Sequence, residues 1–428
     1  MACASAGPRR RVAPRRRVAP RRRVAPRRRV AAPAAVVAVV LVVLSPAQTV
    51  PAQGAQATGG AGTHGYIVAL KRGPGAPVAA SGAGRALIER YGARVRRVYR
   101  TALNGYAVRA NAAQAGRLAA DPRIASVTRD ERVSLRWSRA RLPAPPRGRA
   151  RPPWGLDRID QPDRRLDGAY TAPRGGGRGT TIYVIDSGVR TSHEDFGGRA
   201  RSGWDFVDDD PVAEDGNGHG THVAATAAGT RYGVAKEAAI VAVRVLDDRG
   251  EGTIAQVLAG MDWVLRHARR PAVVNLSLGS ASATPLPEWD AAVRAGIAAG
   301  LVFTVAAGNQ DRPAASFSPG RVPGALTVGA TDRADRRSGF SNWGPGIDLF
   351  APGDRIVSAS DASDTAARTL SGTSMAAPHV AGAAALYLAG HRFATPARVG
   401  AALTAGASKG RVRGAGPGSP NRLLRVAN

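Results

Sequence analysis

Cysteine is nearly absent from this chain of 428 residues, in which Cys3 is the only one. No intramolecular disulfide can form, and a zinc site with cysteine ligands is excluded. At about 150 residues per domain, the length predicts two or three folded units with sizeable cores. Packing and bound ions must therefore stabilise these units.

Acidic residues are scarce in the first third of the chain. Residues 1–149 contain 30 Lys and Arg against 4 Asp and Glu, a net charge of +26, whereas residues 150–428 contain 31 against 27, a net charge of +4. A nucleic-acid-binding protein is expected to carry its basic surface on the folded domain. The near balance of the larger part therefore argues against nucleic acid as a partner.

The chain also lacks an apolar run of comfortable transmembrane length, because the run from Ala34 to Leu44 is too short. Twelve arginines in a repeat over residues 9–29 precede this run, and Ser45-Pro-Ala47 follows it. The pattern predicts a basic leader and signal peptide at 1–47, and hence a secreted, extracellular protein without a stable membrane anchor. A nucleic-acid arm, a twin-arginine signal and a downstream translation start are the alternatives for the repeat.

After a linker at 48–62, residues 63–141 show the alternating patterns of a small α+β domain. The expected strands are Tyr66–Leu70, Gly105–Arg109 and Ile124–Thr128, and the expected helices are Ala83–Tyr91 and Ala112–Ala120. Residues 142–153 are rich in proline and arginine and predict a stiff, exposed linker where a protease would cut.

Residues 154–428 alternate apolar strand-like runs with helical runs. The strand-like runs are Thr181–Ile185, Ile240–Leu246, Ala272–Leu278, Leu301–Ala306 and Ala325–Ala330, and the helical runs are Thr221–Ala228, Ile254–His267, Ala291–Ala299 and Ser374–Leu388. Strands that are apolar on both faces predict a parallel sheet covered by helices, which is a three-layer α/β domain. Catalytic residues are expected at the carboxyl ends of its strands.

Ser374 is the first candidate for catalysis. The stretch Leu370–His379 is rich in glycine and hydroxyl residues and leads into an alanine-rich helical pattern. A serine in the first turn of a helix lies where unpaired N–H groups favour a developing negative charge. Pro378 suggests that this segment is a first turn, where proline is tolerated. The alternative is an ordinary helix-capping serine.

Three further candidates lie at the ends of predicted elements. Asp186 ends a buried strand, His219 lies between two glycines at the start of a helix, and Asn309 follows another strand with an amide suited to an oxyanion hole. Zinc bound by His219 and His222 is disfavoured, because the pair lacks the i, i+4 spacing and the glutamate of zinc proteases. His222 and His379 are expected to satisfy core hydrogen bonds. His193 could line the cleft but carries no catalytic signature.

The chain order Asp, His, Ser matches one of the known triad orders. The stretches Asp186-Ser-Gly188, His219-Gly-Thr-His222 and Gly372-Thr-Ser374-Met-Ala-Ala-Pro378 resemble the signatures of the subtilisin-like serine proteases, specifically the secreted proteinase K-like branch. The resemblance covers residues 154–428, and the preceding domain resembles the inhibitory propeptide of that family.

This resemblance implies a subtilisin-like fold and a self-processing serine endopeptidase with protein or peptide substrates, inhibited by its own propeptide and acting as a monomer. Ser374 would be the nucleophile, His219 the general base and acid, Asp186 the group that orients His219, and Asn309 an oxyanion donor. A catalytically dead binding module is disfavoured because no residue of this set is replaced.

The resemblance also assigns binding residues. Those expected to line the substrate site are Ser277, Leu278, Gly279, Ala306, Ala307 and Gly308. Their small side chains imply a roomy apolar pocket. A structural calcium ion would be bound by the Pro323 and Ala325 carbonyls and the Asp348 carboxylate, and no catalytic metal is expected. A second, weaker match to a calcium site consists of Asp157, Asp160, Gln161 and Asp167. The alternative is that these are solvated surface carboxylates. Val223 stands where some relatives carry a free cysteine.

Overall fold

The computed structural model describes residues 62–73, 76, 78–135, 151–280 and 282–426. The leader predicted at 1–47 lies outside these residues, as do almost all of the linker predicted at 48–62 and most of the linker predicted at 142–153. Within the described ranges, no helix is long and apolar enough to cross a membrane. The fold is therefore described for two parts of the chain, residues 62–135 and 151–426.

The first part has a four-stranded antiparallel sheet in the order β2-β3-β1-β4. Its elements are β1 (His64–Leu70), α1 (Gly82–Arg90), β2 (Arg94–Tyr99), β3 (Gly105–Ala110), α2 (Ala112–Ala119), β4 (Ile124–Arg129) and β5 (Arg132–Ser134). The side chains of Ser81 and Asn111 cap α1 and α2 by accepting backbone N–H groups of the first turns. The helices and sheet enclose a core that includes Val68, Ile88 and Leu118, which confirms the predicted α+β domain.

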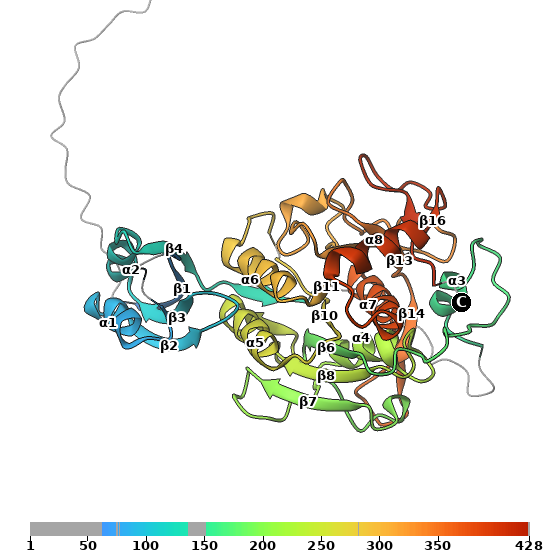
Figure 1. Ribbon diagram of the computed structural model, residues 1–428, viewed down its shortest axis with the longest axis horizontal. Helices are drawn as coiled ribbons and strands as arrows, with labels where there is room; N and C mark the ends of the chain where they lie inside the picture. The colour runs from blue at the N-terminus through green and yellow to red at the C-terminus, as the bar shows by residue number, and fades with distance from the viewer. Residues whose placement is uncertain (1–61, 74–75, 77, 136–150, 281, 427–428) are drawn as a thin grey trace, which may run out of the picture. The chain divides into compact units, whose positions relative to one another are not determined.

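The second part is an α/β unit. Its elements are α3 (Trp154–Ile159), β6 (Thr181–Asp186), β7 (Ala200–Asp205), α4 (His219–Ala228), β8 (Ala239–Arg244), β9 (Glu251–Thr253), α5 (Ile254–His267), β10 (Ala272–Leu276), α6 (Pro287–Ala298), β11 (Val302–Ala306), β12 (Leu326–Thr331), β13 (Leu349–Pro352), β14 (Ile356–Ala359), β15 (Ala367–Leu370), α7 (Thr373–Gly390), α8 (Pro396–Gly406), β16 (Ser408–Lys409) and β17 (Arg422–Leu423). Two short 3-10 turns, Glu194–Phe196 and Ala314–Ser316, complete it (Figure 1).

The large sheet of this unit has the order β16-β17-β13-β12-β11-β10-β6-β8-β7. Its neighbouring strands are parallel except for the antiparallel pair β16–β17. The chain fills the positions on one side of β6 with β7 and β8 and then crosses to β10 on the other side. This change of direction is a topological switch point, where open α/β sheets bind ligands beyond the carboxyl ends of their strands.

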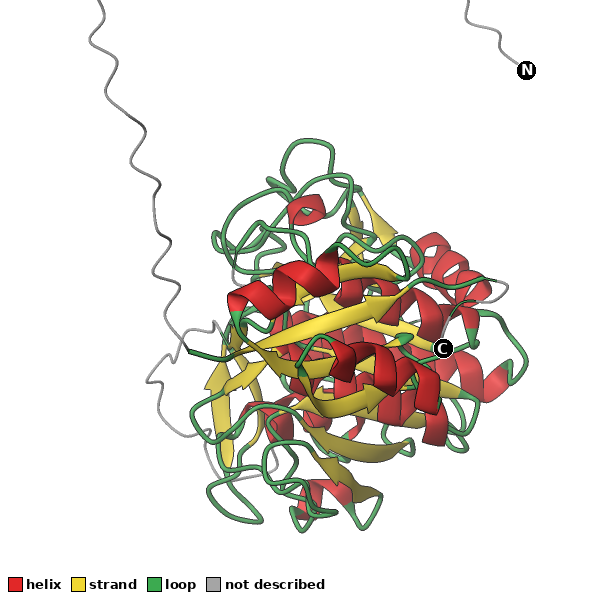
Figure 2. Ribbon diagram, turned by 90° about the vertical axis from the view of Figure 1, so that its left-hand side faces the viewer, coloured by secondary structure: helices red, strands yellow, loops and turns green. Residues whose placement is uncertain are grey.

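Helices cover both faces of this sheet, as Figure 2 shows. α4 and α7 pack together against one face, and α5 and α6 against the other. All residues of α4 are buried, and the buried face of α7 is rich in alanine. A Cβ added at Gly382 of α7 would lie 2.6 Å from the Ala227 carbonyl of α4, so the small residues let the two helices approach closely.

The structure confirms each strand and helix predicted from an apolar run, with ends that differ by a few residues. It adds α3, α8, β2, β5, β7, β9 and β13–β17. Charged residues hide the strand pattern of β2 and β7. The structure also corrects the argument from Pro378. α7 begins at Thr373, so Pro378 is the sixth helical residue and lies beyond the first turn. Ser374 is nevertheless in the first turn, as predicted.

Candidate active site

Asp186 is the last residue of β6, and its carboxylate is completely buried. Its Oδ1 atom accepts hydrogen bonds from the backbone N–H of Ser187 at 2.8 Å and from Nδ1 of His219 at 2.7 Å. Because a carboxylate can only accept, Nδ1 of His219 carries the proton in this bond. The structure therefore brings together two of the predicted site residues.

His219 is the first residue of α4, and two glycines fix its position. Gly218 precedes the helix with a φ of +89°, which favours glycine. A Cβ added at Gly220 would lie 2.0 Å from the carbonyl oxygen of Gly188, directly after the strand that carries Asp186. Both glycines therefore make room for other groups of the protein around His219.

Asp215 organises the turn that leads to His219. Its buried carboxylate accepts the Ser187 hydroxyl, the N–H groups of Asn217 and Gly218, and both the N–H and the hydroxyl of Thr221. The Ser187 hydroxyl in turn accepts the N–H of Gly220 at 3.0 Å. One carboxylate thus joins the end of β6 to the start of α4, which fixes the distance between Asp186 and His219.

Ser374 is the second residue of α7 and is 6% exposed. Its hydroxyl donates a hydrogen bond to the backbone carbonyl of Ser277 at 2.8 Å. Ser277 follows β10, the strand next to β6, so the side chain lies at the sheet edge where Asp186 ends. The first N–H groups of a helix have no partner within the helix, and they make this end favourable for negative charge.

Asn309 follows β11 and is held by the residue before Ser374. Its Oδ1 atom accepts the N–H and the hydroxyl of Thr373, each at 2.8 Å. The Thr373 hydroxyl also accepts the N–H of Gly308 at 3.1 Å. These bonds fix the amide orientation, and its Nδ2 would lie 3.3 Å from a Cβ at Gly372, on the side of the Ser374 backbone.

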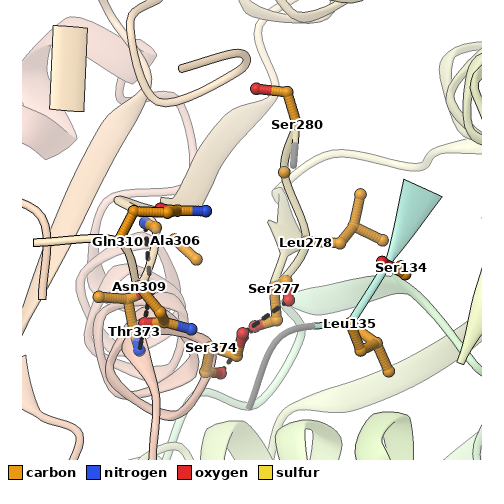
Figure 3. A pocket seen from close by; sticks show the side chains of 12 residues that line it. Ser134, Leu135, Ser277, Leu278, Ser280, Ala306, Asn309, Gln310, Thr373 and Ser374 are labelled. Carbon is orange, nitrogen blue, oxygen red and sulfur yellow. Dashed lines mark hydrogen bonds between the residues drawn. The ribbon is translucent and has the colours of Figure 1, made fainter. Parts of the chain in front are cut away.

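A pocket opens beside Ser374 at this edge of the sheet (Figure 3). Figure 3 shows Ala306 and Asn309 on one wall and the segment from Ser277 to Ser280 on the facing wall. The lining residues are Ser134, Leu135, Ser277, Leu278, Gly279, Ser280, Ala306, Gly308, Asn309, Gln310, Thr373 and Ser374. Ala307, which was also predicted to line it, instead packs in a separate apolar cluster with Ile347 and Phe350.

The first part of the chain contributes directly to this pocket. β5 pairs with β9 as an antiparallel ribbon, and the N–H of Leu135 donates to the Gly250 carbonyl at 3.0 Å. Ser134 and Leu135 then line the pocket together with Ser374. An extended segment that adds to an exposed strand is a common way for a protein to bind a peptide. The C-terminal end of the first part, Ser134 and Leu135, therefore lies at the pocket beside Ser374, in the groove where a peptide substrate would bind.

Three other histidines have structural surroundings. Ring nitrogens of His222 and His379 bond to the backbone carbonyls of Ile356 and Met375, and burial lowers the pKa of His222 to about 3 and that of His379 to about 4. This confirms their predicted place in the core. His193 is buried against the Ala366 carbonyl and does not line the pocket. Within the described residues, no three His, Cys, Asp or Glu side chains form a metal-binding group.

The residues predicted to bind calcium lie around the start of β12. The Asp348 carboxylate accepts the N–H of Thr327 at 2.8 Å, which brings it beside the segment that carries the Pro323 and Ala325 carbonyls. Burial raises the pKa of Asp348. A cation bound next to this carboxylate would offset the cost of burying its charge, and oxygen donors of this kind fit a hard cation such as calcium.

The second predicted calcium set is a connected loop. Asp157 accepts the Gln161 side-chain amide and the N–H groups of Asp167 and Gly168, and burial is the main cause that raises its pKa. Asp157 is 4% exposed and so is not a solvated carboxylate, whereas Asp167 is exposed. Among the described residues, the three carboxylates of this set do not come together as a metal-binding group.

Sequence reasoning missed the supporting residues Asp215, Ser187 and Thr373. Asp215 stands four residues before His219 in a glycine-dense turn, which is the pattern of an Asx turn. Ser187 and Thr373 directly adjoin Asp186 and Ser374, and that proximity was the available signal. Asp215 bonds mainly to its own turn, but its bond to Ser187, 28 residues away, and the bond of Thr373 to Asn309, 64 residues away, could not have been assigned without the fold.

Comparisons with known proteins agree with this geometry. Residues 177–423 match the Subtilase family, and residues 66–136 match Peptidase inhibitor I9. The chain is 48% identical to "Extracellular serine proteinase" of Thermus sp. (strain Rt41A) over 333 residues, which cover 78% of each chain. It is 44% identical to "Alkaline serine exoprotease A" of Vibrio alginolyticus over 334 residues, covering 78% of this chain and 60% of that protein.

A solved structure is also similar. The crystal structure of a cold-adapted subtilisin-like serine proteinase superposes with a TM-score of 0.63 at 49% sequence identity, and it covers 65% of this chain and 100% of its own. The fold and the matches define a subtilisin-like serine protease with an inhibitory propeptide. This chain belongs to the Subtilase family. Its first part is the family's inhibitor-type propeptide.

Proposed function

We propose that Ser374, His219 and Asp186 act as the triad of this serine protease, through an acyl-enzyme on Ser374. The observation that carries the proposal is the 2.7 Å bond between the fully buried Asp186 and His219 side chains, at the edge of the sheet where the Ser374 pocket opens. A buried carboxylate–imidazole pair beside a serine in a cleft is the arrangement that activates a hydroxyl nucleophile.

In the first step, Nε2 of His219 takes the proton of Ser374 as its Oγ attacks the peptide carbonyl. The hydroxyl must first exchange its bond to the Ser277 carbonyl for one to His219. Asp186 keeps the proton on Nδ1 and stabilises the imidazolium that forms. His219 then passes the proton to the departing amine, and water releases the acyl group by the reverse sequence.

The negative charge of the tetrahedral intermediate would be held by the N–H of Ser374 and by Nδ2 of Asn309. The bonds from Thr373 to Oδ1 of Asn309 support this role, because they leave the amide nitrogen directed toward the start of α7. Donors fixed before the reaction need no reorganisation when the charge develops, and one such donor is worth about 3–4 kcal/mol of barrier.

The expected substrates are extended peptides that add to the groove as β5 does. The small residues Gly279, Ala306 and Gly308 on the pocket walls support a preference for cleavage after large apolar or aromatic residues. Profiling the cut sites in a denatured protein mixture tests this. A dominant preference for cleavage after Lys or Arg would contradict the apolar pocket.

The precursor is proposed to be exported and to cut itself. Leu135 in the pocket presents the following chain to Ser374 at high effective concentration, so cleavage is expected between Leu135 and Trp154. The Ser374→Ala variant, made in a protease-deficient host, should then accumulate as an uncut precursor. Mass spectrometry of the culture supernatant decides: a mature species starting near residue 150 in this variant would assign the cut to another enzyme.

Calcium would be held by the Asp348 carboxylate with the carbonyls of Pro323 and Ala325. This ion would be structural, since its ligands lie around the start of β12 and not in the pocket. Its support is the raised pKa of the buried Asp348 carboxyl together with the resemblance described above.

A fluorophosphonate that labels activated serines tests the triad itself. Wild-type mature enzyme should be labelled once, on Ser374, and His219→Ala should lose labelling and hydrolysis by a factor of about 10⁴ or more. Arg178→Ala, which removes an exposed ion pair with Glu237, serves as the control with unchanged activity. Unlabelled but correctly folded wild-type protein would support a binding module instead.

A further inference from the structure

Pro378 leaves one carbonyl of α7 without its helical partner. In a regular α-helix the N–H of residue 378 would donate to the carbonyl of residue 374, four residues earlier. Proline has no N–H, so the carbonyl of Ser374 loses this bond. The residue affected is the proposed nucleophile itself, in the buried first turn of the helix.

The side chain of Ser277 replaces the missing donor. Its hydroxyl donates to the Ser374 carbonyl at 2.8 Å, while the Ser277 carbonyl accepts the Ser374 hydroxyl at 2.8 Å. These two reciprocal bonds form what we call the Ser277–Ser374 clasp, visible in part as dashed lines in Figure 3. The clasp ties the first turn of α7 to the segment after β10.

Two further buried groups determine which way the Ser277 hydroxyl points. The amide Nδ2 of Asn275 donates to the Ser277 oxygen at 2.8 Å, and the Thr304 hydroxyl donates to Oδ1 of Asn275 at 3.0 Å. Asn275, Ser277 and Thr304 are all 0% exposed. Because the Ser277 oxygen already accepts from Asn275, its single proton is directed to the Ser374 carbonyl.

We propose that the Ser277 hydroxyl is a positioning residue, which sets the location of Ser374 by taking the place of the helix bond that Pro378 removes. The inference rests on the proposed role of Ser374 as nucleophile. A helix bond would draw the Ser374 carbonyl along the helix axis, whereas the clasp draws it toward β10. The clasp thereby sets where the Ser374 side chain lies relative to His219 and Asn309.

The test is a double-mutant cycle on the mature enzyme. Ser277→Ala should lower kcat about tenfold with KM changed less than about twofold, because a small displacement of a reacting group is costly while the pocket is unchanged. Pro378→Ala supplies the missing N–H, so the Ser277→Ala/Pro378→Ala double variant should recover to within about threefold of wild-type kcat. Pro378→Ala alone should stay within the same range.

A second variant tests the direction of the hydroxyl bond. Asn275→Asp keeps the shape but offers Ser277 an acceptor, so the hydroxyl proton turns away from Ser374 and kcat should fall as in Ser277→Ala. Thr226→Ala is the matched control, because its buried hydroxyl also donates to a helix carbonyl, that of His222 at 2.8 Å. It should lower Tm without lowering kcat.

Each outcome bears on the inference. Concentrations are set by titration with a fluorophosphonate, so that only folded, reactive enzyme is counted. Wild-type kcat in Ser277→Ala, or a loss of kcat that Pro378→Ala does not restore, overturns the positioning role. If Ser277→Ala does not fold, Asn275→Asp and the double variant decide the matter. Activity retained in Ser374→Ala would instead overturn the proposed function, which keeps the two failures apart.

Discussion

The propeptide part and the protease part differ in what their interiors contain. Among the described residues of 62–135, Asp121 is the one buried charged residue, at 5% exposure. The interior of 151–426 holds many buried carboxylates, imidazoles, amides and hydroxyls, among them Asp186, Asp215, His219 and Asn275. The propeptide part has a mainly apolar core, whereas the protease part has a polar network within its apolar core.

The contacts between the two parts show the same asymmetry. Asp262 of α5 accepts the backbone N–H groups of Arg100, Thr101 and Ala102, and Glu288 of α6 accepts hydroxyls from Ser126 and Thr128 at 2.5 and 2.7 Å. In these contacts the protease supplies the carboxylates and the propeptide supplies neutral donors. Elsewhere in the interface, Arg97 and Arg132 of the propeptide form ion pairs with Asp209 and Glu251 of the protease.

This difference follows from what each part must do. A buried polar network is costly unless every member is paired, but once paired it fixes positions that apolar contacts leave loose. The protease needs such fixed positions for Asp186, His219 and Ser374. The propeptide needs only a surface complementary to the protease. One of its residues also contacts a helix of the protease, because Asp130 accepts the N–H of Ala255 in the first turn of α5. We expect this contact to help α5 form during folding.

The largest expected effect is a difference in stability between variants of two buried aspartates, one from each part. Asp215→Ala removes the acceptor of five hydrogen bonds beside His219 and should destabilise the mature enzyme by about 3 kcal/mol or more, with loss of activity. Asp121→Ala should leave the mature enzyme unaltered, because the proposed cleavage removes that residue with the propeptide. Guanidinium unfolding of both matured variants measures this, and equal stability would contradict the contrast.

Variants of Asn309 test whether the polar network of the protease part contributes to the chemical step. Asn309→Ala should lower kcat by about 10²–10³-fold with KM nearly unchanged, because the lost donor acts on the intermediate and not on the bound substrate. Asn309→Asp should be at least as damaging, because it retains the acceptor for Thr373 but places a negative charge where the oxyanion forms. A rise in KM with normal kcat would assign Asn309 to substrate binding instead.

The interface carboxylates should affect inhibition alone. The combined variant Asp262→Asn/Glu288→Gln weakens charge-assisted bonds to the propeptide, so active enzyme should emerge from processed precursor about tenfold sooner. Its mature kcat and KM should equal those of wild type, because neither residue lines the pocket. Glu237→Gln, an exposed residue paired with Arg178, is the control. An unchanged lag would show that these two carboxylates do not hold the propeptide, and that the remaining contacts, such as the β5–β9 pairing, are sufficient.

The sequence predicted the parts of this molecule that depend on local pattern. Apolar runs located the strands β6, β8, β10, β11 and β12, and the ends of these elements located Asp186 and Asn309. Strands such as β2, with five charged or partly exposed positions among six, carry no such pattern and were missed. The pairing partner decides that such a segment is a strand, and the partner is not visible locally.

The hydrogen bonds that support the site could not be predicted from the sequence either, because their partners are distant along the chain. Asp215 with Ser187, Asn309 with Thr373, and Ser277 with Ser374 are 28, 64 and 97 residues apart. Pro378 shows how a local rule can mislead. Proline suggested a first turn, whereas the fold accepts it deeper in α7 because Ser277, from another part of the chain, supplies a substitute donor.

The smallest predicted effect concerns Asp348 and ties calcium to pH. Burial holds the folded-state pKa of Asp348 above its unfolded value, so without an ion the protonated carboxyl favours the fold at acid pH, and that stability is lost as pH rises through the folded pKa. Calcium binds the ionised carboxylate and should act in the opposite direction. A chelator should therefore lower Tm by about 5–10 °C at pH 8, as expected for a ligand at about 100 times its Kd in a domain of this size.

That chelator effect should shrink as pH falls toward the Asp348 pKa, and Asp348→Asn should nearly abolish it at every pH. Asp163→Asn is the control, because Asp163 is an exposed carboxylate paired with Arg411, far from these carbonyls in sequence. Differential scanning calorimetry of the three matured proteins, with and without chelator at pH 5 and pH 8, gives the comparisons required. A chelator effect of the same size at both pH values would mean that the ion is bound by other ligands. No chelator effect at pH 8 would mean that calcium does not stabilise this enzyme.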